Sequence, residues 1–177
     1  MRAEEYLKHW EKIKGWTHYT WPKHRRRFTQ ISVRLAGDSC IDVGCGLGHS
    51  TKILAGLYKA KWTGLEFSES VVERARKIFP KIPFICAESY DLATICGREY
   101  DSVVCSEVIE HVEDDRSFIK EVIKIANIRA VFTTPNRIVD DPGHLRLYTE
   151  EMLGDLFAGY KHAVKSVGGY FYIGVAK

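Results

Sequence analysis

The stretch CIDVGCGLGHSTKIL, residues 40 to 54, decides the fold of this chain. It begins as a short apolar strand, turns through Gly44, Gly46 and Gly48, and continues with helical periodicity. Glycine allows a tight turn and lets a ligand touch the backbone without a Cβ in the way. In an open α/β sheet such a turn lies at the carboxyl ends of the strands, where ligands bind. The stretch therefore predicts a ligand-binding turn, although a mere tight turn would also need these glycines.

Strand and helix patterns alternate on either side of this turn. Two β-type runs around Gly168-Gly169 then form a hairpin signal within residues 162–177. This order predicts a Rossmann-like, doubly wound α/β fold, whose mainly parallel seven-stranded sheet ends in an antiparallel C-terminal hairpin. The first five strands are expected at 39–44, 61–67, 83–88, 100–106 and 129–136, and the helices among them at 49–58, 68–79, 116–126 and 149–157.

Local signals set the ends of several helices. Ser68 and Thr149 are expected N-caps, Pro80 stops the helix that Ser68 begins, and Gly37 is a candidate C-cap. Helical periodicity over 3–14 and 24–37 precedes the first strand, with a break between them. We therefore expect one domain over 1–177, divided into a helical cap at 1–37 and a cofactor-binding core at 38–177.

Composition narrows the class of protein. The chain has 177 residues, and no apolar run approaches the roughly 18 residues needed to cross a bilayer. The N-terminus MRAEEYLKHW is charged and amphipathic, which is unlike a secretory signal and predicts a cytoplasmic location. Five cysteines without a CxxC pair indicate reduced structural thiols. A net charge of +3 is too small to indicate nucleic acid, although KHRRRF at 23–28 is a local basic cluster.

Glu66 ends the second expected strand, about 20 residues after the glycines, where a carboxylate can accept hydrogen bonds from both ribose hydroxyls. The alternative is a solvated glutamate at a strand end. A dinucleotide fingerprint would need glycine at position 49, where His49 stands, and the chain has no GK[ST] for a nucleoside triphosphate. A nucleoside without phosphates therefore fits better, and His49 opposes the rival hypothesis of a nicotinamide-dependent oxidoreductase.

Four motifs then occur in order: IDVGCGLG, WTGLEF, FICAES and YDSVVCSEVIEHV. Together they resemble class I S-adenosylmethionine-dependent methyltransferases, from about Ser39 to the C-terminus. The resemblance implies that the glycine turn receives the methionine and ribose of S-adenosylmethionine, and that Glu66 takes the ribose hydroxyls. It also implies that Phe67 lies against the adenine, and that Glu88 accepts from the adenine amino group near the Ser89 N–H. The whole implied cofactor set is Asp42, Gly44, Gly46, Gly48, Glu66, Phe67, Glu88, Ser89 and Ser106.

EVIEH, residues 107–111, follows the fourth expected strand at the same sheet edge. If it is helical, Glu107, Glu110 and His111 share one face, and such a mixed set suits Mg²⁺, Mn²⁺ or Zn²⁺. His144, after the fifth strand, is the candidate fourth ligand. EVIEH, TPN and the H-x-x-x-Y-T at His144 resemble the small-RNA 3′-terminal 2′-O-methyltransferases, which implies a metal site made of these four residues. A shorter E-x-x-E-H turn also occurs in ubiquinone-pathway O-methyltransferases. The alternative is a dipole-favoured helix start with an unrelated loop histidine.

Methyl transfer from a sulfonium is an in-line displacement that needs an aligned, nucleophilic acceptor atom. A divalent cation would lower the pKa of a bound hydroxyl and orient it, whereas without a cation His111 would be the general base. The expected catalytic residues are His111 and Glu107, and the expected reaction is methylation of a hydroxyl on a small molecule or on RNA. A non-catalytic cofactor-binding scaffold is a further alternative.

The N-terminal segment WTHYTWPKHRRRF, residues 16–28, interleaves aromatic residues with Arg25, Arg26 and Arg27. Such a segment could stack bases and bind phosphates, cover an aromatic small molecule, or simply pack on the domain. One of the arginines could also meet the carboxylate of the cofactor. The oligomeric state is not predictable from these patterns.

Overall fold

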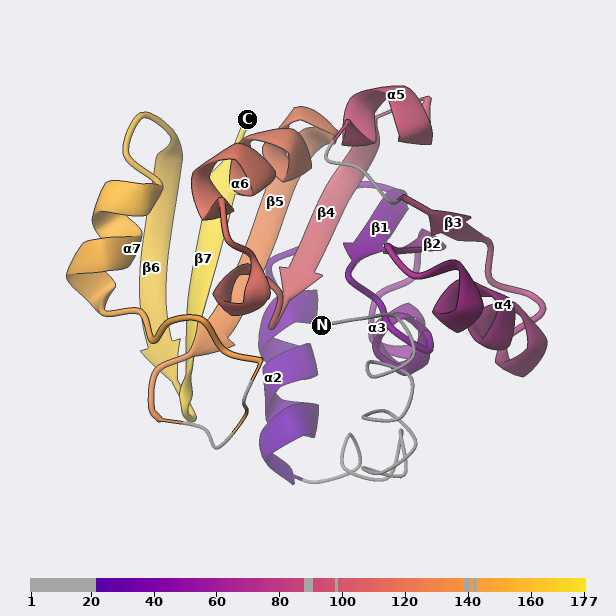
Figure 1. Cartoon of the computed structure of the whole chain (residues 1–177), viewed down its shortest axis with the longest axis horizontal. Helices are drawn as coiled ribbons and strands as arrows, with labels where there is room; N and C mark the ends of the chain where they lie inside the picture. Colours follow the sequence, from indigo (N-terminus) through magenta and orange to yellow (C-terminus); the bar gives the residue numbers. More distant parts are fainter. Residues whose placement is uncertain (1–21, 88–90, 98, 139–140, 142) are drawn as a thin grey trace.

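A single seven-stranded sheet forms the centre of the molecule (Figure 1). The computed structural model describes residues 22–87, 91–97, 99–138, 141 and 143–177. The strand order is β3-β2-β1-β4-β5-β7-β6; the first five of these strands are parallel, and β7 runs antiparallel to both β5 and β6. This confirms the predicted fold class. The strands are β1 Ser39–Val43, β2 Lys61–Glu66, β3 Phe84–Cys86, β4 Tyr100–Ser106, β5 Ala126–Pro135, β6 Lys161–Val167 and β7 Tyr170–Ala176.

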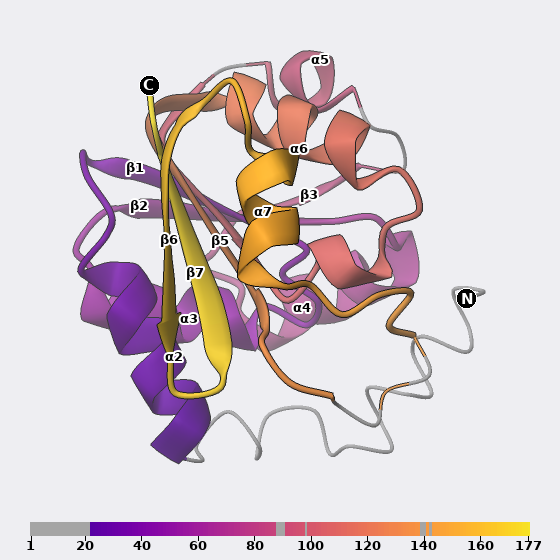
Figure 2. The same cartoon turned by 90° about the vertical axis from the view of Figure 1, so that its left-hand side faces the viewer.

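Helices cover both faces of the sheet (Figure 2). From the central strand β1, the chain adds β2 and β3 toward one edge of the sheet, and it later adds β5 beside β4 toward the other edge. Because crossovers between parallel strands are right-handed, these two directions place the connecting helices on opposite faces of the sheet. One layer contains α2 Pro22–Ser32, α3 His49–Leu57 and α4 Glu69–Ile78, and the other contains α5 Leu92–Cys96, α6 Asp115–Lys124 and α7 Glu150–Leu156.

Each helical layer buries an apolar surface against the sheet. Phe28 and Ile31 of α2 and Leu54 of α3 pack with Trp62 and Tyr172 on one side. On the other side, the buried face of α6 packs with residues of α7 and of the central strands. The central parallel strands are therefore buried on both faces, which explains why they appear in the sequence as nearly continuous apolar runs.

The helix ends agree only in part with the local signals. Thr149 caps α7 as predicted, because its hydroxyl accepts a hydrogen bond of 3.2 Å from the Met152 N–H. Ser68 occupies the N-cap position of α4, but its side chain makes no capping bond and lies instead 3.1 Å from the Ser70 hydroxyl. The predicted C-cap at Gly37 is wrong, since α2 already ends at Ser32.

Gly37 has a different use, at the amino-terminal edge of the sheet. Its φ is +76°, and a Cβ there would lie 2.2 Å from Cβ of Asp101. Oδ2 of Asp101 accepts hydrogen bonds from the N–H groups of Asp38, at 2.9 Å, and Ser39, at 3.1 Å. These bonds fasten the start of β1 to β4. Two further differences from the predicted elements are the short helix α5, which no pattern indicated, and β5, which begins three residues early at Ala126.

Several sequence predictions lie outside the described residues. They are the helix over 3–14, the aromatic residues Trp16, Tyr19 and Trp21, and the adenine-side pair Glu88 and Ser89. The division into a cap and a core at residue 37 stays a prediction. The five cysteines are free thiols. Within the described ranges no helix has both the length and the apolar character that a bilayer crossing requires.

Candidate functional site

The glycine turn follows β1 directly, at the edge where the parallel strands end (Figure 1). Gly44, Gly46 and Gly48 all have positive φ values, of 76°, 53° and 82°. A Cβ on Gly44 would lie 2.4 Å from Cγ2 of Val108, and a Cβ on Gly48 would lie 2.5 Å from Cζ of Phe84. The turn therefore needs glycine both for its backbone conformation and for its close packing.

Glu66 ends β2 beside this turn, with only 1% of its surface exposed. Its Oε2 accepts a hydrogen bond of 3.0 Å from the Gly46 N–H, and its Oε1 accepts from the N–H groups of Phe67, at 2.9 Å, and Ser68, at 3.3 Å. Burial raises the pKa of Glu66 to about 7, although these hydrogen bonds act in the opposite direction. The alternative of a solvated glutamate is therefore wrong, and the carboxylate is tied to the backbone of the glycine turn.

Asp42 lies beneath the turn and connects β1 to the first turn of α3. Its Oδ2 accepts hydrogen bonds of 2.7 Å from the hydroxyls of both Ser50 and Thr51, and only 2% of the residue is exposed. Burial raises the pKa of Asp42 to about 6, while the two hydroxyls act to lower it. In this structure the residue fixes the helix that follows the glycines, so contact with a cofactor stays a prediction.

Two more residues of the predicted cofactor set lie at the same edge. Phe67 directly follows Glu66 and is 48% exposed. Ser106 ends β4, and its hydroxyl lies 2.8 Å from the hydroxyl of Thr133 on β5. The carboxyl ends of β1, β2 and β4 thus bring together residues that are up to 64 positions apart in the sequence, from Asp42 to Ser106.

The chain leaves β4 through Glu107, whose φ of +58° is the only positive value outside glycine among the described residues. The left-handed region costs a non-glycine residue roughly 1–2 kcal/mol. Two hydrogen bonds to Thr133 hold it there: the Glu107 N–H donates to the Thr133 carbonyl at 2.9 Å, and the Thr133 hydroxyl donates to Oε1 of Glu107 at 3.0 Å. A short 3₁₀ helix, Ile109–His111, follows. The expectation that Glu107, Glu110 and His111 share one helical face is therefore wrong, because Glu107 lies before the helix.

Three of the four predicted metal ligands nevertheless come together. Glu110, His111 and His144 each offer a ligand atom, and these atoms all lie within 4.8 Å of one another. The two imidazole rings meet edge to face, with centroids 4.7 Å apart. The two segments are joined by the Leu145 N–H, which donates to the Glu110 carbonyl at 2.8 Å, and by Nδ1 of His111, which lies 2.9 Å from the Gly143 carbonyl oxygen. This carbonyl requires a proton on Nδ1, so Nε2 of the neutral His111 ring carries the free lone pair.

Glu110 is the most unusual group of this cluster. It is fully buried, and neither of its carboxylate oxygens makes a hydrogen bond of good geometry with a described residue, although the nearby Thr134 hydroxyl acts to lower its pKa. Burial, and then the neighbouring Glu107 carboxylate, raise the pKa of Glu110 well above its usual range. Burial also lowers the pKa of His144, and the nearby His111 acts in the same direction. A buried carboxylate without a well-placed donor is costly, and a cation is one partner that would satisfy it.

Glu107, the fourth predicted ligand, has another partner. Its Oε2 lies 3.2 Å from Nη1 of Arg27, which α2 brings to this edge of the sheet. Burial raises the pKa of Glu107, while the positive charge of Arg27 acts to lower it. No motif identified Arg27, which was only one member of a basic cluster. The available signal was its position one turn before the apolar Ile31, since an arginine on the buried face of a helix needs an acidic partner.

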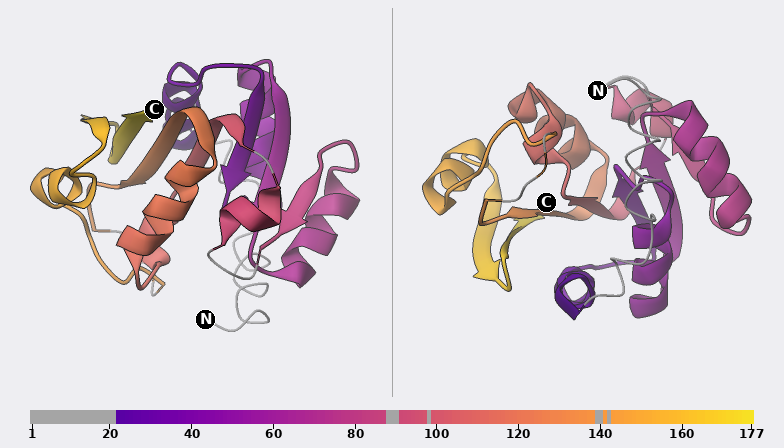
Figure 3. Two further views of the ribbon diagram at one scale, coloured as in Figure 1. Left: turned by 90° about the horizontal axis from the view of Figure 1, so that it is seen from above. Right: turned by 60° about the horizontal axis from the view of Figure 1, so that its bottom comes forward.

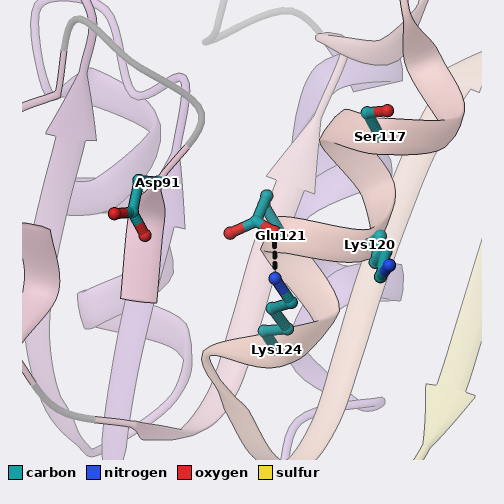
Figure 4. A pocket seen from close by; sticks show the side chains of 5 residues that line it. All are labelled: Asp91, Ser117, Lys120, Glu121 and Lys124. Atoms are coloured by element: carbon teal, nitrogen blue, oxygen red, sulfur yellow. Dashed lines mark hydrogen bonds and ion pairs between the residues drawn. The ribbon is translucent and has the colours of Figure 1, made fainter. Parts of the chain in front are cut away.

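A shallow depression of about 440 Å³ lies on another part of the surface (Figure 4). The side chains around it come from α6 and from the residue before α5, and Lys124 pairs with Glu121, three residues earlier on α6. Because it is open and contains charges of both signs, it offers no enclosed site for a nucleoside. Its lining residues are Asp91, Ser117, Lys120, Glu121 and Lys124, none of which belongs to the glycine turn or to the cluster around Glu110.

The fold, together with the glycine turn and Glu66 at the carboxyl edge of the sheet, defines a Rossmann-like α/β protein. Proteins of this class bind nucleoside cofactors beside such a turn. Residues 41–132 match the family model described as "Methyltransferase domain", which is more than half of the 177 residues. The chain belongs to this methyltransferase family. The match confirms the resemblance to S-adenosylmethionine-dependent methyltransferases that the four motifs indicated.

Individual relatives agree with this assignment. A probable S-adenosylmethionine-dependent methyltransferase of Mycolicibacterium smegmatis is 28% identical over 127 residues, covering 71% of this chain and 49% of its own length. The ubiquinone biosynthesis O-methyltransferase of Coxiella burnetii is 29% identical over 119 residues, covering 64% and 50% respectively. The chain thus spans about half the length of the curated relatives it matches. The fold is also that of the Synechocystis magnesium protoporphyrin IX methyltransferase solved with bound SAH, with a TM-score of 0.67, 20% identity, and coverage of 88% of this chain and 83% of that one.

Proposed function

We propose that this chain binds S-adenosylmethionine at the carboxyl edge of the sheet and transfers its methyl group to the oxygen of a hydroxyl-bearing acceptor. The observation that carries the proposal is the junction between Glu66 and the glycine turn. There a buried carboxylate, hydrogen-bonded to the backbone at Gly46, ends the strand next to β1 in a chain of the methyltransferase family. A strand-end carboxylate in this position is suited to both hydroxyls of a ribose.

The cofactor would extend from the glycine turn toward β3. Glu66 would accept charge-assisted hydrogen bonds from the ribose hydroxyls, and the exposed ring of Phe67 would lie against the adenine. Glu88 would accept a hydrogen bond from the adenine amino group, with the Ser89 N–H nearby, and Ser106 would lie near the methionine part. Asp42 would act from below, because its bonds to α3 fix the helix that follows the glycines.

A divalent cation, Mg²⁺, Mn²⁺ or Zn²⁺, would be held by Glu110, His111 and His144. The fit rests on the donor set, one carboxylate and two imidazoles, and on the buried Glu110 oxygens that have no well-placed donor among the described residues. A bound cation would lower the pKa of the acceptor hydroxyl and hold it in place. Glu107 would support the turn that carries Glu110 and His111, since Arg27 and Thr133 already occupy its carboxylate.

The protein's own groups would align the acceptor and accept its proton. Without a bound cation, the Nε2 atom of His111 would be the leading general base, because the Gly143 carbonyl at 2.9 Å holds the proton on Nδ1. The transfer would then be an in-line displacement, with the glycine turn fixing the donor and the cluster fixing the acceptor. Oxygen is favoured as the acceptor atom because relatives of this chain are named as O-methyltransferases.

Metal binding can be tested without knowing the acceptor. Titration with Mn²⁺, followed by electron paramagnetic resonance of the free ion, should show one site in the unaltered protein. Glu110→Gln and His144→Ala should lose that site, whereas His162→Ala, which removes a histidine of β6 outside the cluster, should keep it. Full retention of Mn²⁺ by both cluster variants would contradict the cation part of the proposal.

The reaction itself can be tested with S-adenosylmethionine labelled with tritium in its methyl group. Incubation with extracted cellular RNA and, separately, with an organic-solvent extract of cells should transfer label to one of the two fractions. EDTA should abolish the transfer if the cation is required, and should leave it if His111 acts alone. Transfer of label to neither fraction by a protein that binds S-adenosylhomocysteine would favour the scaffold alternative.

A further inference from the structure

Helix α2 contributes a buried charge to the carboxyl edge. Arg27 is only 5% exposed, and its guanidinium lies 3.2 Å from Oε2 of Glu107. Cζ of Arg27 also lies 5.0 Å from the ring centroids of both Phe28, on the same helix, and Tyr170, on β7. Figure 3 shows α2, in indigo, between the C-terminal hairpin and α3. Burying a guanidinium is unfavourable unless a carboxylate and aromatic faces compensate for the lost water, so this position of Arg27 is specific.

The partner of Arg27 also has an unfavourable backbone conformation. Among the described residues other than glycine, Glu107 alone has a positive φ, and such a conformation persists only where its surroundings hold it. The carbonyl of Thr133 accepts a hydrogen bond from the Glu107 N–H, and the Thr133 hydroxyl donates one to Oε1 of Glu107. Arg27 pairs with the remaining carboxylate oxygen, Oε2. With both carboxylate oxygens fixed, Glu107 has one orientation in which to turn the chain out of β4.

The direction in which the chain leaves β4 at Glu107 affects both the glycine turn and the cluster of Glu110, His111 and His144. The next residue, Val108, packs against the glycine turn, because its Cγ2 would lie 2.4 Å from a Cβ on Gly44. Two residues further on, Glu110 and His111 enter the cluster with His144. The segment from Glu107 to His111 therefore connects the proposed cofactor turn to the proposed acceptor cluster, and Arg27 contacts its first residue.

We infer that Arg27 is a positioning residue, which sets the Glu107–His111 segment through its ion pair with Glu107. Helix α2 would then be part of the active site and not only a cover for the sheet. The inference rests on the proposed function for its catalytic meaning, but the ordering of the segment can be measured without cofactor, cation or acceptor.

Hydrogen exchange of individual amides, followed by NMR on the whole chain, measures this ordering directly. Three N–H groups report on the segment: Glu107, bonded to the Thr133 carbonyl; His111, bonded to the Val108 carbonyl; and Leu145, bonded to the Glu110 carbonyl. Arg27→Gln should raise the exchange rates of these three amides roughly tenfold to a hundredfold, as expected for the loss of a charge-assisted bond. The amides of β1 should keep their native rates.

Matched variants separate positioning from packing. Arg25→Gln removes the same charge from an exposed position of the same helix, and should leave the three amides unchanged. Ile31→Val weakens the buried face of α2 without touching the ion pair, so it should lower the melting temperature without selectively raising the three rates. Arg27→Lys keeps a positive charge and should restore part of the protection.

A double-variant comparison completes the test. Glu107→Gln should loosen the same amides, and Arg27→Gln combined with Glu107→Gln should be no looser than the more affected single variant, because both remove one interaction. If Arg27→Gln does not fold, Arg27→Lys and Glu107→Gln decide instead. Native rates in Arg27→Gln, an equal rise in Arg25→Gln, or fully additive effects would overturn the inference. Calorimetry with S-adenosylhomocysteine on the unaltered protein tests the proposed function separately. The exchange rates are measured without any ligand, so the positioning role of Arg27 can hold even if S-adenosylhomocysteine does not bind.

Discussion

At Glu66 one carboxylate binds the protein's own backbone and, in the proposed function, would also bind the ribose of the cofactor. Three N–H groups already donate to it, yet each carboxylate oxygen can accept more than one hydrogen bond. Glu66→Gln replaces one carboxylate oxygen with an NH₂ group, which cannot accept a hydrogen bond from the N–H of Gly46 or Phe67. It also removes the negative charge of the side chain. We expect the affinity for S-adenosylhomocysteine to fall about tenfold to a hundredfold. Isothermal titration calorimetry measures this, with the exposed Glu69→Gln as the control that keeps native affinity.

Asp42 should make the stability of the protein depend on pH. Its pKa is raised to about 6 by burial, from an ordinary value of 3.8, so folding takes up a proton between these two values. Stability is therefore lost as the pH rises through this window, and Asp42→Asn has no proton to lose. The free energy of unfolding of Asp42→Asn, relative to the unaltered protein, should rise by up to about 3 kcal/mol between pH 4 and pH 7. Urea unfolding at several pH values tests this, and a difference independent of pH would contradict it.

Single residues also show where sequence reasoning reaches its limit. Glu66 was predictable, because the glycine turn and a carboxylate at the end of the next strand form one pattern. The pairing of Arg27 with Glu107 was not, since 80 positions separate the two residues, although the helical spacing of Arg27 from Ile31 indicated that this arginine needed an acidic partner. Only the packing of α2 against the hairpin brings the two together, and no local signal records that contact.

Among the elements, the β1–α3 connection depends on the absence of a side chain. Gly48 has a φ of +82°, and a Cβ there would lie 2.5 Å from the ring of Phe84. Gly56, near the end of α3, is exposed and has nothing within 4 Å of such a Cβ. Gly48→Ala should therefore cost about 2 kcal/mol or more of stability, whereas Gly56→Ala should add about 0.5–1 kcal/mol. Chemical denaturation of both variants measures the contrast, and equal effects would show that the turn tolerates a side chain.

The EVIEH segment illustrates a different limit at the level of elements. Its i, i+3, i+4 spacing predicts a shared helical face, and two of its three residues, Glu110 and His111, do lie together beside His144. The backbone conformation of Glu107, however, is set by Thr133 on the neighbouring strand, which the spacing does not contain. The ligand-type residues were thus predictable from their order along the chain, and the break before Ile109 was not.

The molecule as a whole should respond to its cofactor as one unit, because β1, β2 and β4 all contribute to the same edge. A ligand that binds only the folded state stabilises it by about 2.7 kcal/mol at a hundred times its dissociation constant. For a chain of this size that corresponds to a rise in melting temperature of roughly 5–10 °C. Differential scanning fluorimetry with S-adenosylhomocysteine should show this rise, and NADH at the same concentration should give none. A larger shift with NADH would revive the oxidoreductase hypothesis.

The layered architecture was the most predictable feature of the molecule. Strands buried on both faces, amphipathic helices between them and a diglycine hairpin each follow from local periodicity, and short crossovers leave few ways to combine them. The short helix α5 escaped prediction because its five residues are too few to show a helical period. Contacts between a strand and a helix, such as those of Asp42 with α3, depend on three-dimensional packing that periodicity does not encode.

The bonds of Asp101 at the opposite edge have a consequence for protein engineering. There the carboxylate fastens the start of β1 to β4, and Gly37 leaves room for its approach. These bonds lie at the amino-terminal edge of the sheet, so they hold β1 to β4 independently of the loops at the carboxyl edge. Loops at the carboxyl edge can therefore be exchanged without unfastening β1 from β4, provided that His144 and Leu145, which contact the Glu110–His111 segment, are kept in the connection between β5 and α7.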